Sequence, residues 1–163
     1  MRGIPVDLAV RSEVTIDRPA AIVWPYVLDM SKWMSGLRFQ HVEGTAGEEG
    51  EVRLVTAQAD GTYPSYFITT VRVKPFEQYV LKVKPEEGAN YFGFADFSFT
   101  DRNGKTQLIY DIYLELIVAA ADKEDLRKIR EEQCAGIRAD VTRNNEALKR
   151  LVESSGTNPH GVQ

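Results

Sequence analysis

Residues 17–36 read DRPAAIVWPYVLDMSKWMSG, and this stretch combines two tryptophans with a proline placed directly after the first of them. Asp17 is a favourable helix N-cap and Pro19 is acceptable in a first helical turn, so a helix is predicted to begin near these residues. Pro25 lacks the N–H that a helix interior requires, which costs about 3 kcal/mol. We therefore expect a short or kinked helix, a break, and a second short helix that ends at Gly36.

On both sides of this helical stretch, apolar residues recur with a period of two, which is typical of strands. Before it, apolar residues mostly alternate from Leu8 to Ile16, as they do in a half-buried strand. After it, a period of two continues from Leu37 to about Val118. Turn-forming residues interrupt that period at 44–50, 60–61, 74–75, 85–90 and 101–104. Six strands fit between these marks, and connections this short join antiparallel neighbours.

Residues 122–153 predict one long helix, because they contain no proline and a single glycine. At 1.5 Å per residue it would be roughly 45 Å long. One face of this helix carries the apolar residues Leu126, Ile129, Ile137, Val141, Leu148 and Leu151, interrupted by Arg130, Gln133 and Asn144. Residues 154–163 lack an apolar pattern and predict a disordered tail, so residues 1–153 are expected to form a single domain.

Composition argues against several classes of function. The net charge is -4 and the sequence has no block of lysine or arginine, which disfavours binding to nucleic acid. The longest apolar run, residues 116–121, is far shorter than the ~20 residues that span a bilayer. The first ten residues do not resemble a secretory signal. We therefore expect a cytoplasmic protein without stable membrane insertion.

The sequence offers few groups for metal or catalytic chemistry. Cys134 is the only cysteine, which excludes an internal disulfide and a zinc site built on several thiolates. His41 falls on a predicted strand and His160 in the predicted tail, so a ligand cluster or a Ser-His-Asp set cannot be assembled from them. We predict no catalytic residue, no metal and no cofactor.

The order of predicted elements gives an α+β protein with its helices on one face of an antiparallel sheet. A sheet of about seven twisted strands tends to curl, and one straight helix touches only part of its concave side. The rest of that side must be covered by large side chains, by another element or by a ligand.

This arrangement resembles the START-like superfamily, also called SRPBCC or Bet v 1-like, and within it the polyketide cyclase and dehydrase type. The resemblance covers residues 8–153. It is carried by the order of the elements, by the closing helix that ends in NNEALKRLVE, and by an opening pattern found here at Ile16, Pro19, Val23, Trp24, Asp29 and Trp33. It implies the helix-grip fold: a seven-stranded curved antiparallel sheet wrapped around the long C-terminal helix, with an apolar cavity between them. Two short helices after the first strand would close one end.

The stretch YFGFADFSFT at 91–100 indicates which strand faces line such a cavity. Phe97 and Phe99 share a face that lacks the Asp96 carboxylate, so this face is predicted to be concave. With the inward positions of the other elements, the predicted ligand-binding residues are Trp33, Met34, Tyr66, Tyr79, Leu81, Phe97, Phe99, Tyr110, Ile112, Arg130, Gln133, Ile137 and Val141. Three alternatives stay open: the rings fill the core completely, Arg130 extends to solvent, and Gln133 bonds to a strand.

The resemblance and the aromatic strand faces together predict a carrier or sensor. Its partner would be a small hydrophobic molecule, lipid-like, aromatic or polyketide-like, held between sheet and long helix. One alternative is an enzyme of the cyclase or aromatase kind, for which Tyr66, Tyr110 and Arg130 are the candidate acids or bases. Another is a protein-interaction module similar to co-chaperone relatives. The sequence leaves open the identity of the ligand and whether the protein is a monomer or a dimer.

Overall fold

The computed structural model describes residues 3–57, 65–86 and 91–155. In chain order the elements are β1 (Ile4–Ile16), α1 (Ala20–Leu28), the short 3-10 helix η1 (Met30–Lys32), β2 (Leu37–Glu43), β3 (Val52–Ala57), β4 (Tyr66–Lys74), β5 (Gln78–Pro85), β6 (Tyr91–Arg102), β7 (Lys105–Val118) and α2 (Lys123–Ser155). Two of the turns predicted from the sequence, 60–61 and 85–90, lie wholly or partly outside the described residues.

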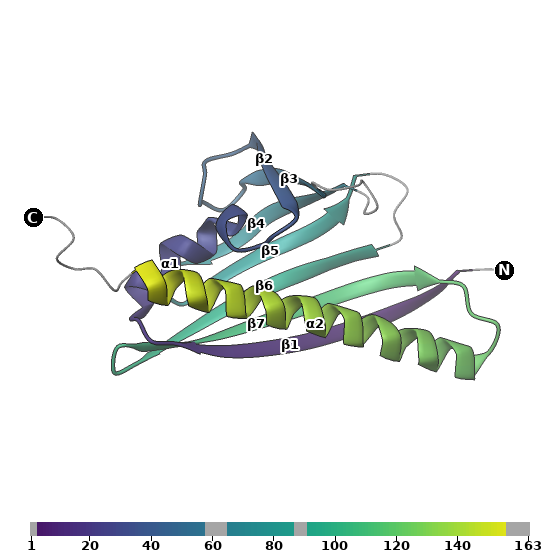
Figure 1. The fold of residues 1–163 in the computed structure, drawn as a ribbon. Coiled ribbons are helices and arrows are strands. Elements are labelled where there is room, and N and C mark those ends of the chain that lie inside the picture. Colours follow the sequence, from purple (N-terminus) through teal and green to yellow (C-terminus); the bar gives the residue numbers. More distant parts are fainter. Residues whose placement is uncertain (1–2, 58–64, 87–90, 156–163) are drawn as a thin grey trace, which may run out of the picture.

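The seven strands form one sheet in the order β1-β7-β6-β5-β4-β3-β2, and every neighbouring pair is antiparallel. The long helix α2 crosses one face of this sheet, with α1 and η1 on the same side (Figure 1). The predicted helix-grip fold is thus confirmed. The first strand begins at Ile4, four residues before the predicted start, because the end of β7 is long enough to pair with it from Ile4 to Val6.

The stretch around Pro25 forms a helix, a break and a second short helix, as its sequence predicts. Pro25 lies inside α1, and that helix has only nine residues. The predicted cap was wrong, because Asp17 gives α1 no side-chain hydrogen bond and the N-cap residue is Pro19. Instead the Ala20 N–H donates to Oδ2 of Asp101, at 3.0 Å, from the hairpin between β6 and β7.

Replacing Asp101 by alanine should lower the free energy of unfolding by about 0.5–2 kcal/mol, the usual range for loss of an N-terminal cap. The same carboxylate also accepts the Gly104 N–H at 3.1 Å, so the tight turn loses a bond as well. Urea denaturation measures the change. Asp17→Ala is the matched control and should stay within about 0.5 kcal/mol of the wild type. A larger loss in the control than in Asp101→Ala would contradict this account of the cap.

The buried face of α2 is restricted to its C-terminal half. The buried residues are Val141, Asn145, Leu148 and Val152, whereas none of residues 123–140, all of which are described, is buried. Val141 and Leu148 are buried as predicted, whereas Asn145 and Val152 are buried in place of the predicted Asn144 and Leu151. Asn145 Nδ2 donates to Ser12 Oγ on β1 at 3.1 Å. The helix also continues through Ser155, so the first two residues of the predicted tail are helical and the others lie outside the described residues.

Candidate functional site

The concave face of the sheet is filled at one end by aromatic rings. On β6 this face carries Phe99, Phe97, Ala95 and Gly93, all of them buried. The Phe97 ring stacks on Tyr110 with 4.2 Å between centroids and on Tyr79 with 6.2 Å, and Trp33 meets it edge-on at 6.0 Å. These rings form a solid core under α1 and η1, and they confirm that the face without the Asp96 carboxylate points inward.

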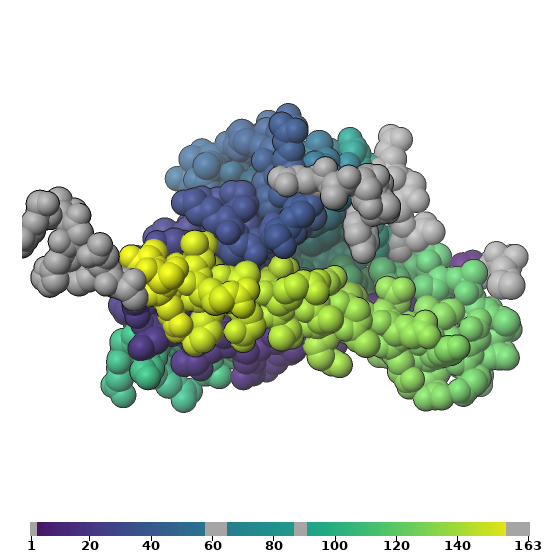
Figure 2. Space-filling model, in the orientation of Figure 1, coloured from purple at the N-terminus to yellow at the C-terminus, as the bar shows by residue number. Residues whose placement is uncertain are grey.

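At the other end of the same face the side chains of β6 shrink to the methyl group of Ala95 and the hydrogen of Gly93. Around them the structure leaves six inward-facing residues only partly buried: Tyr66, Val83, Tyr91, Ile112, Leu114 and Leu116. The half of α2 without buried residues lies on this side as well. In Figure 2 the surface is hollowed between α2 and the segment that carries η1 and β2. We call the region of these six residues the hollow.

Gly93 cannot be enlarged without moving the neighbouring strand. A Cβ atom at this position would lie 2.0 Å from the Tyr113 carbonyl oxygen and 2.5 Å from Cδ2 of Leu114. Glycine therefore allows β6 and β7 to approach closely, and it also keeps the floor of the hollow free of a side chain.

Three tyrosines bring hydroxyl groups to this region. Tyr66 and Tyr91 contact each other edge-on, with 6.3 Å between ring centroids, and Tyr110 stacks on the core beside them. None of the three hydroxyls forms a hydrogen bond with any residue that the structure describes. None of these oxygens is among the fully buried polar atoms without a partner, so water can still reach them. A molecule that covered them without an acceptor would leave each hydroxyl unpaired at a cost of about 1–3 kcal/mol.

Burial keeps these hydroxyls protonated. It raises the pKa of Tyr66 to about 12, and it raises the pKa values of Tyr91 and Tyr110 above the ordinary tyrosine value. The nearby Tyr66 phenol raises the Tyr110 pKa further. At neutral pH all three groups are therefore hydrogen-bond donors and do not act as anionic bases.

The raised pKa of Tyr66 predicts a loss of stability in alkali. In the unfolded chain this phenol ionises near pH 10, whereas in the folded protein it stays neutral to about pH 12. Between these values the unfolded state has released the proton and the folded state has not, so the free energy of unfolding falls as pH rises. Urea denaturation across this range should show a smaller fall for Tyr66→Phe than for the wild type. Equal falls would contradict the prediction.

The predicted ligand-binding residues divide into four groups by burial. Trp33, Met34, Tyr79, Leu81, Phe97, Phe99 and Val141 are buried in the packed core; Tyr110 is buried next to the hollow; Tyr66, Ile112 and Ile137 are partly buried. Trp33 donates from Nε1 to the Tyr26 carbonyl at 2.8 Å, which fixes its ring in the core. Arg130 and Gln133 are exposed, which agrees with the alternative in which Arg130 extends to solvent. Ligand contact by these residues stays a prediction.

A buried polar cluster on β3 and its neighbours was missed by the sequence reasoning. Glu51 is 5% exposed and its carboxylate lies 3.7 Å from Nε of Arg53. Arg53 Nη2 donates to the Tyr79 hydroxyl at 2.9 Å, and Thr70 Oγ1 lies 3.1 Å from the same oxygen. Glu51 directly follows the predicted turn at 44–50, and no role was predicted for it. The signal that could have found the pair is the spacing of two that places Glu51 and Arg53 on the same face as the buried Val55.

Residues 3–57, 65–86 and 91–155 contain no group of three or more His, Cys, Asp or Glu side chains placed to hold a metal ion. Over the same residues no helix is both long enough and apolar enough to cross a membrane.

Comparisons with known proteins agree with the fold. The model of a family described as polyketide cyclase / dehydrase and lipid transport matches residues 7–153. No curated protein matches the sequence. Among solved structures, the Zhui aromatase/cyclase from Streptomyces sp. R1128 is 16% identical, with a TM-score of 0.74 over 96% of this chain and 100% of that one.

A second similar structure is norcoclaurine synthase from Thalictrum flavum, solved in complex with dopamine and hydroxybenzaldehyde. It is 11% identical, with a TM-score of 0.65 over 98% of this chain and 91% of that one. At such identities the likeness concerns the fold.

Proposed function

Because the chain belongs to the polyketide cyclase / dehydrase and lipid transport family, we propose that it binds a small, mainly apolar molecule in the hollow. The observation that carries this proposal is the set of three protonated tyrosine hydroxyls without protein partners, next to partly buried aliphatic side chains. Such a site suits a lipid-like, aromatic or polyketide-like compound with a few oxygen atoms. The cytoplasm stays the predicted location.

Apolar contact would supply most of the affinity, at ~25 cal/mol per Å² removed from water. Leu114, Leu116 and Ile112, all partly buried, offer this surface on β7. The tyrosine hydroxyls would then select for acceptor oxygens, because a ligand without them would leave the donors unpaired.

The proposal can be tested by native mass spectrometry and by binding of a fluorescent probe. Gently purified protein should carry a co-purifying hydrophobic compound, and anilinonaphthalene sulfonate should bind and be displaced by that compound. Ile137→Trp, on the helix wall of the hollow, should weaken probe binding. Ala139→Trp, on an exposed position of the same helix, is the matched control and should bind as the wild type does. Equal binding by both variants would place the ligand elsewhere.

The tyrosines give a finer test. Tyr66→Phe and Tyr110→Phe should each weaken binding of the co-purified compound by roughly two- to tenfold, the effect of one lost hydrogen bond. Tyr113→Phe, on the outer face of the sheet, should leave binding unchanged. If Tyr66→Phe and Tyr110→Phe both bind the compound as tightly as the wild type, the hydroxyls do not contact the ligand.

A second candidate is an enzyme of the cyclase or aromatase kind. It is favoured by the closeness of the Tyr66 and Tyr110 phenols, because two neutral donors can stabilise a developing enolate oxygen. The described residues of the hollow, however, include no Asp, Glu or His that could remove a proton. Incubation of the co-purified compound with fresh protein separates the two functions: a carrier returns it unchanged, whereas an enzyme releases a product, and Tyr110→Phe would then bind without turnover.

A further inference from the structure

The outer face of the sheet carries an exposed aromatic patch that the proposed function does not use. Phe92, Phe94 and Tyr113 are 39%, 36% and 46% exposed. Phe94 lies directly opposite Tyr113 in the pairing of β6 with β7, and the rings of Phe92 and Phe94 meet edge-on at 5.4 Å. We call these three residues the outer patch. Three adjacent exposed rings mark an interaction surface far better than scattered single ones do.

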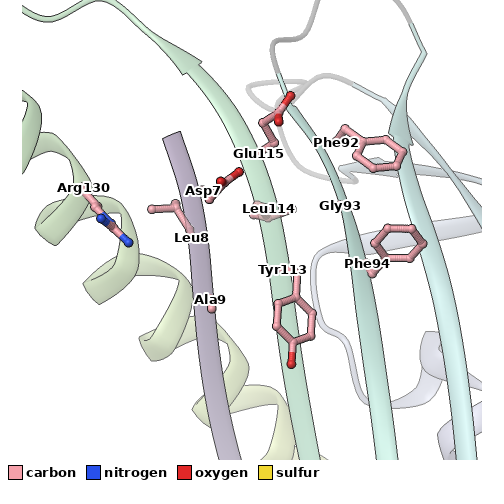
Figure 3. Close-up of a pocket in the computed structure, with 10 residues that line it drawn as sticks. All are labelled: Asp7, Leu8, Ala9, Phe92, Gly93, Phe94, Tyr113, Leu114, Glu115 and Arg130. Atoms are coloured by element: carbon pink, nitrogen blue, oxygen red, sulfur yellow. The ribbon is translucent and has the colours of Figure 1, made fainter. Parts of the chain in front are cut away.

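A groove runs through the outer patch. Its volume is about 370 Å³. Phe92, Phe94, Tyr113 and Glu115 line it from the outer face, together with the inward-facing Leu8, Gly93 and Leu114 and with Arg130 of α2 (Figure 3). Figure 3 shows both phenylalanine rings on the side of β6 away from α2, and Arg130 at the far end beyond β1.

Charged residues flank the outer patch with opposite signs on its two sides. Asp7 and Glu115 lie opposite each other on β1 and β7, whereas Lys82 and Lys84 lie on β5. Within the described part of the chain none of the four forms an ion pair, and the Lys82 ammonium instead lies 5.4 Å from the centre of the Phe92 ring. A patch with acid on one side and base on the other is complementary to a copy of itself.

We propose that the outer patch is the interface of a homodimer. A two-fold axis parallel to β6, in the plane of contact, places β7 of one copy over β5 of the other. Glu115 then faces Lys84 of the second copy, Tyr113 faces its Lys82, and the phenylalanines of the two copies meet at the centre. Face-to-face packing of sheets with nearly aligned strands is a common arrangement.

Curvature limits this contact to the central strands, because two convex faces touch only along their crests. Asp96, the next outward residue on β6, bounds the apolar surface, and its carboxylate accepts hydrogen bonds from Gln78 Nε2 at 3.2 Å and Ser98 Oγ at 3.3 Å. An interface of this size is at the small end for protein pairs, so the dimer should dissociate on dilution. The acidic pair at Asp7 and Glu115 disfavours an anionic membrane as the partner.

Sedimentation velocity over a range of protein concentrations tests the proposal. The wild type should change from 18.4 kDa monomer to dimer as concentration rises, whereas Phe94→Glu should stay monomeric. Lys84→Glu should weaken the dimer, and Lys84→Glu combined with Glu115→Lys should restore it, because the two charges face each other across the axis. Circular dichroism confirms that each variant is folded. Phe94, Lys84 and Glu115 are all exposed, so folding should be retained.

Three outcomes would overturn the proposal. A wild type that stays monomeric at every concentration excludes the dimer. A dimer that persists in Phe94→Glu places the interface elsewhere. A monomeric wild type that sediments with phosphatidylcholine vesicles, while Phe94→Glu does not, assigns the outer patch to a membrane surface. All three are independent of ligand binding in the hollow, which lies on the opposite face.

Discussion

Arg53→Met is expected to lower the free energy of unfolding by about 3–5 kcal/mol, because removing one partner of a buried ion pair leaves the other charge uncompensated. Glu51 would be that charge, with its side chain only 6% exposed, and it would keep only the Gly47 N–H and the His41 ring, whose Nδ1 lies 3.3 Å from Oε2. The Tyr79 hydroxyl would also lose the donor that now lies 2.9 Å away. Urea denaturation at neutral pH measures the loss.

The double variant Arg53→Met with Glu51→Gln separates the charge from the packing. A neutral amide at position 51 removes the unpaired charge and can still accept the Gly47 N–H that the carboxylate accepts at 3.1 Å. The double variant should therefore be more stable than Arg53→Met alone. If the second substitution only adds to the loss, the pair is not the source of the effect and the arginine acts through its packing on the Phe39 ring.

Phe97→Ala is expected to lower the free energy of unfolding by about 3–5 kcal/mol, as truncation of a buried phenylalanine does. Its side chain is fully buried and lies among Tyr110, Tyr79 and Trp33, which cannot all move into the space left behind. The loss should appear as a lower urea midpoint with an unchanged slope.

The control for this variant is Thr100→Ala, on the exposed face of the same strand, which should stay within about 0.5 kcal/mol of the wild type. A small loss for Phe97→Ala would mean that the packed end of the concave face can collapse or already contains free space. In that case the boundary between the core and the hollow would have to be moved toward α1.

The division of the concave face into a packed end and an open end follows from the order of residues on β6. The rings of Phe99 and Phe97 belong to the packed core with α1 and η1, whereas beyond the small Ala95 and Gly93 the inward residues of the neighbouring strands are only partly buried. This alternation could be predicted from YFGFADFSFT, because each residue of a strand points to the face opposite that of its neighbour. The sequence could not predict which end of the face stays open, because that depends on where α1 and α2 lie.

The polar groups show the same difference between local and distant information. Asp17 has the right residue type and position for a cap, yet the bond to α1 comes from Asp101, which the pairing of β6 with β7 brings to the helix start. In the sequence Glu51 follows a predicted turn and Arg53 lies on a predicted strand. Only the folded sheet buries Glu51 and brings Arg53 to the Tyr79 hydroxyl.

Periodicity and turn chemistry by themselves determined seven antiparallel strands, a broken helical stretch around Pro25 and one long closing helix. They also determined the inward face of β6. Each of these features depends on residues that lie within a few positions of one another, so a local sequence pattern is enough to predict it. Tertiary structure alone decided which half of α2 is buried, where the hollow lies and which charges are paired. Each of these depends on the register and crossing of segments about 100 residues apart, such as Arg11 with Asp111 or Ser12 with Asn145, and no local pattern records that geometry.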